Sequence, residues 1–475
     1  MNMVNGEKKH LLVPLLVQTP EENTRLPGQV FEAGELNASQ YGQGPCDPRI
    51  SALIHTPTFL RLQHIKQLGL VSRIWPHATH TRYEHSLGCY YLAKRALSLI
   101  SPQRKGQRSQ KEKETSEHAF LLAALLHDVG HRPFAHAFEG RGMWQVSHEQ
   151  AGRTLIEGSE LATVIERDYH LSPKQVADFI DPPVEGMCSL YDEMLRPLIA
   201  GSLDIDKLDY LVRDARGCQI PFDASVPLDF LAALRIGRPP GSAKDRLVLI
   251  SHATHSLMKL LMLRYSMYTE VYWGDSNRAY NIMLVRAVQD ALRSGSMAPE
   301  QLPENDADFL ARLRMPDMPS STQILVQALL QDQPYEILLT LSSQAEPLAC
   351  QLNQLASQAQ RCREIECGLA SHVSQQFELE IADHEILLDV LCPKPGHWDM
   401  EGWISYPDPD EAQSTYMTWS DAIRVHPTGL ASASQLRCPI HIRASARVAF
   451  LMRSRQDLLC SWLAQCLERG GEKER

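Results

Sequence analysis

The stretch from Phe120 to Glu139, FLLAALLHDVGHRPFAHAFE, constrains the fold most, because it joins an apolar run to a dense group of polar side chains. The first half has the composition of a helix buried in a core. The second half places five hydrogen-bonding or ionisable groups within ten residues: His127, Asp128, His131, Arg132 and His136. Burial of such groups is unfavourable unless each finds a partner. The stretch therefore predicts a helical core that ends at a polar pocket.

Size and charge limit the class of protein. The 475 residues are too many for one minimal core, so we expect one large domain with additions, or two domains. The formal net charge of -10 permits nucleic-acid binding but does not indicate it, and an anionic substrate would need a local basic pocket. Eleven cysteines without a CxxC pair indicate a reducing compartment. No apolar run reaches membrane-spanning length, so we expect a soluble cytoplasmic protein that does not enter a membrane.

The hydrophobic spacing divides the chain into segments. Residues 1–45 are predicted to form an N-terminal arm, and the highly charged residues 101–117 a polar insertion loop. Apolar residues recur with a helical period over most of the chain between residues 46 and 295. Helices are expected at 56–70, 84–100, 116–129, 148–166, 172–180, 189–199, 203–215, 227–234 and 254–295.

The period changes toward the C-terminus. Residues 296–375 are predicted to be a mainly helical extension. After about residue 376, FELEIADHEILLDVLCP and CPIHIRAS alternate as strands do, and ARVAFLMRSRQDLLCSWLAQCLE predicts a terminal amphipathic helix. The expected fold class is therefore mainly α, an all-helical core over 46–295 followed by the extension and a smaller C-terminal α/β portion over 376–475.

A metal site is the chemistry that the polar group suggests. His127 and Asp128 project about 100° apart on a helix and reach one point only near its end. Alone, such a pair is more often a helix cap or a buried hydrogen-bonded pair. Two further ligands, His85 and Asp206, are available on neighbouring predicted helices. Two imidazoles and two carboxylates suit an octahedral divalent ion such as Mn, Mg, Fe or Ni better than a structural zinc site.

Two polar stripes support a cleft between helices. Asp206, Tyr210 and Asp214 follow each other at intervals of four residues, and Arg264, Tyr268 and Tyr272 repeat this spacing. Acids and tyrosines that share a helix stripe are better explained by a polar cleft than by a solvent-exposed face.

The ordered motifs RYEHSLG, LLHDVGHRPFAH, SHEQ and DIDKLDYLVRD resemble the HD-domain phosphohydrolases, and among them the deoxynucleoside triphosphate (dNTP) triphosphohydrolases. The resemblance runs from about Thr56 to Arg278 and more weakly through the C-terminal portion. It implies an HD phosphohydrolase domain over 46–295, a nucleotide substrate and a homo-oligomer. It also implies that the divalent metal is held by His85, His127, Asp128 and Asp206.

The same resemblance implies roles for the other polar residues. Arg82, Lys207 and Arg264 match phosphate-binding cations. Gln67 and Asp214 match groups that read the sugar 3′-hydroxyl, Tyr210 a ring that excludes a 2′-hydroxyl, and Tyr272 an aromatic beside the sugar or base. His148 with Glu139 is expected to be the acid/base pair, with His131 and His136 as α-phosphate contacts.

Several positions depart from the family pattern. Gly274 and Asp275 stand where the family usually has His-Lys, so the phosphate contact there is expected to differ. His55 and Gln63 replace an acid and an arginine that read an activating guanine nucleotide in regulated members. Activation of that type is therefore expected to be absent or rebuilt.

Three functions are compatible with the sequence. The first is metal-dependent hydrolysis of dNTPs to deoxynucleoside and inorganic triphosphate. The second keeps the metal but acts on another nucleotide or phosphate ester, because one helical core serves several phosphohydrolases. Cyclic dinucleotide hydrolysis is disfavoured within it, because the chain lacks a GYP motif. The third is a catalytically silent nucleotide-binding or nucleic-acid-binding protein, against which the complete set of polar residues argues.

Overall fold

The computed structural model describes residues 35–38, 41–45, 47–100, 110–138, 146–183, 189–299, 302–341, 347–391, 400–406, 415–425 and 439–471. The predicted fold class is confirmed, because the described chain is mainly helical with a smaller strand-containing C-terminal portion. The strands are β1 (Glu35–Ala38), β2 (Gly42–Pro45), β3 (Leu234–Gly237), β4 (Arg246–Ile250), β5 (Glu336–Leu341), β6 (Ile386–Asp389), β7 (Trp403–Tyr406), β8 (Thr415–Thr418) and β9 (Ile440–Ala444).

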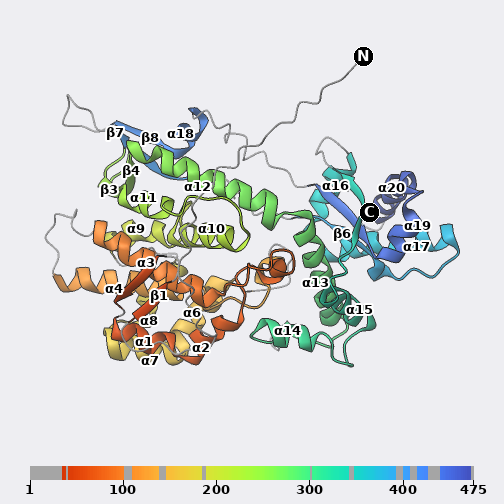
Figure 1. Cartoon of the computed structure of the whole chain (residues 1–475), viewed down its shortest axis with the longest axis horizontal. Coiled ribbons are helices and arrows are strands. Elements are labelled where there is room, and N and C mark those ends of the chain that lie inside the picture. Colours follow the sequence, from red (N-terminus) through yellow and green to blue (C-terminus); the bar gives the residue numbers. More distant parts are fainter. Residues whose placement is uncertain are drawn as a thin grey trace, which may run out of the picture.

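The α-helices fall into three groups along the chain (Figure 1). The N-terminal group is α1 (Pro48–Ile54), α2 (Pro57–Leu60), α3 (Arg82–Ile100), α4 (Gln110–Leu126), α5 (Ala135–Phe138), α6 (His148–Gly158), α7 (Glu160–Val164), α8 (Pro173–Ile180), α9 (Leu190–Leu195), α10 (Ile205–Gly217), α11 (Val226–Ala232) and α12 (Thr254–Ser266). The middle group is α13 (Asp275–Arg293), α14 (Asp306–Arg312) and α15 (Ser320–Leu330). The C-terminal group is α16 (Pro347–Leu355), α17 (Ala359–Phe377), α18 (Trp419–Val425), α19 (Ala446–Met452) and α20 (Gln456–Gly471).

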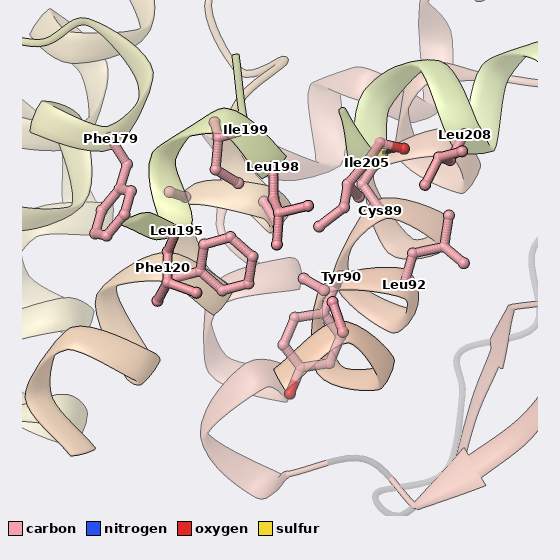
Figure 2. Packing of buried hydrophobic residues seen from close by; sticks show 14 of the residues in the cluster. Cys89, Tyr90, Leu92, Phe120, Phe179, Leu195, Leu198, Ile199, Ile205 and Leu208 are labelled. Carbon is pink, nitrogen blue, oxygen red and sulfur yellow. Dashed lines mark hydrogen bonds between the residues drawn. The ribbon is translucent and has the colours of Figure 1, made fainter. Parts of the chain in front are cut away.

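The largest hydrophobic core joins the N-terminal helices. α3 packs against α4 and α10, and α4 also packs against α8. Figure 2 shows part of this core, where Phe120 of α4 meets Phe179 of α8 edge to face, with ring centroids 6.0 Å apart. Since nearly every side chain in the second half of α4 is buried, this helix has little freedom to move and fixes the position of the polar residues that follow it.

The strands of the described residues form three small sheets. β1 and β2 form an antiparallel hairpin, and β9 lies between β5 and β6 in an antiparallel sheet. The third sheet has the order β3-β4-β7-β8, with β4 and β7 parallel. The strands predicted around residues 386–389 and 440–444 are present as β6 and β9. The domain boundaries stay a prediction, although strand pairing crosses them, since β7 joins β4 of the helical core and β5 joins β9.

The structure corrects several predicted elements. Residues 56–70 form short helical turns instead of one helix, and residues 110–117 of the predicted loop already belong to α4. The predicted helix 254–295 is interrupted at Trp273 and Gly274, and the terminal helix is divided into α19 and α20. The hairpin β3-β4 lies inside the region expected to be all helical, and β5 lies inside the predicted helical extension. Local periodicity missed these features because long-range packing decides where short elements begin and end.

Figure 1 shows two lobes connected through α12 and α13. α3, α4 and α8–α11 lie in one lobe, and α16, α17, α19 and α20 in the other. In the part of the chain that the structure describes, no helix combines the length and apolarity needed to cross a membrane.

Candidate metal centre and adjoining cavity

Three helix ends bring the predicted metal ligands together. α3 begins at Arg82 and so carries His85 in its first turn, whereas α4 ends at Leu126, directly before His127 and Asp128. α10 begins at Ile205 and carries Asp206 in its first turn, where a carboxylate interacts favourably with the helix dipole.

The ligand atoms of these four residues lie close together. The Nε2 atoms of His85 and His127 are 3.2 Å apart, and Asp206 Oδ1 is 3.0 Å from the first and 3.7 Å from the second. Asp128 Oδ1 is 3.4 Å from His127 Nε2, and Asp128 Oδ2 is 3.9 Å from His85 Nε2. Neighbouring ligands of an octahedral ion with bonds of about 2.1 Å are separated by about 3.0 Å. The spacing of the four side chains therefore fits a divalent cation.

The hydrogen bonds of the two imidazoles support the same conclusion. His85 Nδ1 lies 2.8 Å from Asp209 Oδ2, and His127 Nδ1 lies 3.0 Å from the carbonyl oxygen of Ala124. Because both acceptors require a proton on Nδ1, a neutral ring has its lone pair on Nε2. Two lone pairs and two carboxylates then face one point, which is stable only with a positive charge between them.

The pKa shifts of His127 and Asp206 also indicate that this cluster favours a positive charge. Burial lowers the pKa of His127, but Asp128 and Asp206 outweigh it and raise that pKa above its usual value. Burial likewise opposes ionisation of Asp206, yet contacts with His127 and His85 hold the pKa of this carboxyl well below its usual range. Without a metal, a proton shared with these histidines balances the carboxylates.

The buried ion pair between Arg213 and Asp209 orients the His85 ring through its Nδ1 atom. Arg213 donates two hydrogen bonds, of 2.7 and 3.0 Å, to Asp209, which in turn accepts from His85. Burial raises the pKa of Asp209, but Arg213 and His85 overcome this effect and lower it to about 2. Gly88 of α3 makes the arrangement possible, since a Cβ there would lie 2.0 Å from Asp209 Oδ1. Carboxylates that orient metal-binding histidines raise the basicity of the ligand.

Cys89 also lies near the two histidines, and His85, Cys89 and His127 together form a group that could hold a metal. Its Sγ is 3.7 Å from His85 Nε2. Burial raises the pKa of this thiol, which keeps it protonated, and a thiol must lose its proton to bind a metal strongly. The carboxylates of Asp128 and Asp206 are therefore the better third and fourth ligands.

A group of three histidines lies beside the metal cluster. The rings of His131 and His148 are stacked with centroids 3.9 Å apart, and His136 lies 5.5 Å from His131. Arg82 joins this group to the metal cluster, since it donates to Asp128 Oδ2 at 2.7 Å and to His136 Nε2 at 3.0 Å. Burial, reinforced by Arg82 and the other histidines, holds the pKa of His131 well below its usual value, so its ring is neutral at neutral pH.

One cavity of about 610 Å³ joins the predicted site residues. It contains members of every predicted class: Gln67, Arg82, His127, Asp128, His131, His136, His148, Asp206, Lys207, Tyr210, Asp214, Arg264 and Tyr272. His85 is fully buried behind the wall, and Glu139 lies outside the described residues. The structure therefore brings together all the predicted site residues that it describes.

The far wall of the cavity is aromatic. Tyr272 donates a 2.7 Å hydrogen bond to Asp214, and its ring lies 6.4 Å from Tyr210 and 5.0 Å from Tyr268. The other oxygen of Asp214 contacts His80 Nε2 at 2.7 Å. Since both oxygens of Asp214 are engaged, this carboxylate holds the wall in position.

Sequence reasoning missed several residues of this site. Asp209 and Arg213 lie on the face of α10 next to the predicted stripe, and their spacing of four residues was the available signal. Glu149 lines the cavity and lies 3.2 Å from His148 Nε2, and it directly follows that histidine in the SHEQ motif. Arg278 and Trp273 also line the cavity. No periodic pattern singled them out, because they flank the break between α12 and α13.

Comparisons with known proteins agree with this geometry. The HD domain family model matches residues 82–211, which include all four predicted metal ligands. YwfO of Bacillus subtilis, described as uncharacterized, is 32% identical over 247 residues, which are 52% of this chain and 52% of that protein. Human SAMHD1, described as a deoxynucleoside triphosphate triphosphohydrolase, is 32% identical over 256 residues, covering 46% of this chain and 38% of that protein. The chain thus spans about half or less of the length of these relatives.

Solved structures share the fold over most of the chain. A phosphohydrolase from Bacteroides thetaiotaomicron has a TM-score of 0.64 and 21% identity, covering 86% of this chain and 99% of its own. A hypothetical protein from Aquifex aeolicus has a TM-score of 0.61, also at 21% identity, covering 88% and 98%. At this identity the likeness shows the fold alone. Residues 82–211 thus match the HD domain, and the family match and the SAMHD1 relatives support a relationship of the chain to the HD-domain phosphohydrolases, with the dNTP triphosphohydrolases among its relatives.

Proposed function

We propose that the protein hydrolyses dNTPs to deoxynucleoside and inorganic triphosphate, with water attacking the α-phosphorus. The observation that carries this proposal is the single cavity that joins a four-ligand metal cluster, a histidine group, several cations and a tyrosine wall. A nucleoside triphosphate needs these same elements: neutralisation of phosphate charge, proton transfer, and an apolar surface for sugar and base.

His85, His127, Asp128 and Asp206 would hold the divalent ion. When bound, this ion supplies Lewis acidity toward the α-phosphate and favours deprotonation of the attacking water. Mn, Mg, Fe and Ni all suit the mixed nitrogen and oxygen ligands.

The chain's own cations position the triphosphate. Arg82 presents a guanidinium between Asp128 and His136, at the junction of the metal cluster and the histidine group. Lys207 is oriented by Asp204, whose carboxylate accepts from its Nζ at 2.6 Å. Arg264 lies over the ring of Tyr268, at 5.8 Å from the ring centroid, and contributes the third phosphate contact.

Proton transfer is assigned to the histidine group. The side chain of His148 is more exposed than that of His131, on which it stacks. The carboxylate of Glu149 lies 3.2 Å from His148 Nε2. His148 therefore remains the proposed acid/base residue, with Glu139 as its predicted partner and Glu149 as a second carboxylate that can orient the ring. His131 and His136 are proposed to contact the α-phosphate. His136 Nε2 accepts a hydrogen bond from Arg82, which places its ring beside this cation.

The sugar is proposed to lie against Tyr210 and Tyr272. Gln67 Oε1 is buried in the cavity wall without a hydrogen-bond partner among the described residues, so it can accept from a 3′-hydroxyl. Asp214 is proposed to take part in the same contact, through the oxygen that it shares with Tyr272.

An activity assay with chromatographic separation tests the reaction. The purified protein is incubated with each dNTP and each ribonucleotide in the presence of Mn or Mg, and the products are resolved by ion exchange. We expect inorganic triphosphate and deoxynucleoside from dNTPs. Turnover only of other phosphate esters would instead support a different HD phosphohydrolase, and binding without product under any metal would support a catalytically silent protein.

We predict that Tyr210→Ala relaxes discrimination against ribonucleotides about tenfold or more, because removal of the ring opens space for a 2′-hydroxyl. The measurement is the ratio of kcat/KM for a dNTP and its ribonucleotide. Tyr210→Phe is the matched control, since it keeps the ring and should keep the ratio. An unchanged ratio in Tyr210→Ala would remove the steric role of this residue.

We further propose that the protein acts in the cytoplasm as a homo-oligomer, which the resemblance implies. Light scattering of the purified protein at several concentrations measures the assembly state, and a monomer at all concentrations would contradict this expectation.

A further inference from the structure

Arg278 is a buried cation that the proposed mechanism does not use. Its side chain is 1% exposed, and it belongs to the first turn of α13, directly after the break that follows Tyr272. Arg278 lines the cavity together with Asn277 and Asn281 of the same helix. Its Nη1 has no hydrogen-bond partner among the described residues.

The charges around Arg278 do not balance. Its Nε lies 3.1 Å from Asp389 Oδ2, and Arg443 Nε donates to the same oxygen at 2.8 Å. Two guanidinium groups therefore share one carboxylate. A buried cluster with an uncompensated positive charge is costly, and an anionic ligand would remove that cost.

Asp275 does not compensate this charge. Its carboxylate faces His441 Nε2 at 3.0 Å and is 61% exposed, on a residue that is absent from the described cavity lining. Burial, together with Arg278 and Arg443, lowers the pKa of His441, so this ring is neutral at neutral pH. Asp275 thus connects α13 to β9 and leaves the surplus charge at the cavity.

The C-terminal portion holds Arg278 in place. Arg278 Nη2 donates to the carbonyl oxygen of Asp389 at 3.0 Å, at the end of β6, and Arg443 lies on the adjacent strand β9. Asp389 itself lines the cavity. α13 also packs against α5, the helix that carries His136. Arg278 and the histidine group therefore line the same cavity. The guanidinium is therefore fixed before any ligand arrives, which lowers the entropic cost of binding.

We propose that Arg278 binds a phosphate group of the substrate, and that it supplies the positive charge missing at Gly274 and Asp275. This inference rests on the proposed function for the identity of the ligand, a nucleoside triphosphate. A guanidinium can donate two parallel hydrogen bonds to phosphate oxygens, and Nη1 is the donor still available. Arg278 lies three residues after Asp275 in the first turn of α13, so a cation is available on the same helix turn.

Titration calorimetry with inorganic tripolyphosphate tests the contact without requiring turnover. No free divalent ion is added, so that chelation contributes no heat. We expect Arg278→Gln to weaken binding about 10- to 100-fold, the range for loss of a hydrogen bond between charged groups. Arg278→Lys keeps the positive charge but loses the two parallel N–H donors of the guanidinium, and it should weaken binding less, by about 3- to 10-fold. In turnover assays we expect Arg278→Gln to raise KM for dNTPs.

Arg286 provides a matched control on the same helix. It is equally buried, but it is engaged by Asp290, Glu366 and Asp383 and does not belong to the described cavity lining. Arg286→Lys should leave tripolyphosphate affinity within twofold of wild type. Thermal denaturation shows whether each variant is folded. If Arg278→Gln fails to fold, the tripolyphosphate affinity of Arg278→Lys is compared with that of the wild type instead.

Three results would overturn the inference: no tripolyphosphate binding by the wild-type protein at millimolar concentration, wild-type affinity in Arg278→Gln, or wild-type affinity in Arg278→Lys. A different result would overturn only the proposed function. If tripolyphosphate binds in an Arg278-dependent manner but no dNTP is hydrolysed, the phosphate contact stands and the dNTP assignment does not.

Discussion

Asp128→Ala is expected to lower triphosphate release at least about 10³-fold, equivalent to about 4 kcal/mol of transition-state stabilisation. The Asp128 carboxylate lies against the proposed metal ligand His127, and it also accepts from Arg82 at 2.7 Å. Arg82 and His127, together with the other residues at this junction, hold the pKa of Asp128 far below its usual range despite burial. The carboxylate is therefore charged at all physiological pH values, and its removal takes a negative charge from the metal cluster.

The measurement combines ion-exchange analysis of products with elemental analysis of bound metal. We expect the variant to lose metal as well as activity, and we expect Mn to raise the thermal midpoint of the wild type but not of Asp128→Ala. Asp245→Ala is the control, because Asp245 is exposed and pairs with the exposed Arg238 at 2.7 Å. Full metal content and activity in Asp128→Ala would show that the metal lies elsewhere.

Gly88→Ala is expected to reduce the free energy of unfolding by about 3 kcal/mol and metal affinity by about 10- to 100-fold. A Cβ at this position would lie 2.0 Å from Asp209 Oδ1 and 2.4 Å from Arg213 Nη2. Since the three residues are buried, the ion pair must separate or α3 must move away from α10. Either change removes the carboxylate that orients His85.

The unfolding free energy is measured by denaturant titration, and metal affinity by competition with a chelator. Gly158→Ala is the matched control, because Gly158 is also helical but no atom lies within 4 Å of its added Cβ. Helix propensity alone favours alanine by about 1 kcal/mol, so this control should be neutral or stabilised. Equal stability and metal affinity for Gly88→Ala and wild type would show that Asp209 is not needed to position His85.

The helix α10 shows how far sequence reasoning reached into the site. The stripe of Asp206, Tyr210 and Asp214 was predicted from a spacing of four residues, and all three line the cavity. The neighbouring stripe of Asp209 and Arg213 has the same spacing but was not assigned. Its function depends on His85, which is 124 residues away from Asp209 in sequence. Periodicity shows which residues share a face, but it does not show what that face meets.

The break between α12 and α13 shows the same limit. The resemblance to the family predicts a changed phosphate contact at Gly274 and Asp275, but it offers no replacement cation. Arg278 became a candidate only through its position in the cavity wall and through Asp389 and Arg443, which reach it from strands β6 and β9.

The sequence alone determined the mainly helical class and the order of the polar motifs, because helical periodicity and side-chain chemistry are local properties of the chain. Tertiary structure decided which of the polar residues converge, and it placed β7 beside β4 and Arg278 beside Asp389. Contacts between distant segments depend on how whole helices and strands pack, and no short stretch of sequence contains that information.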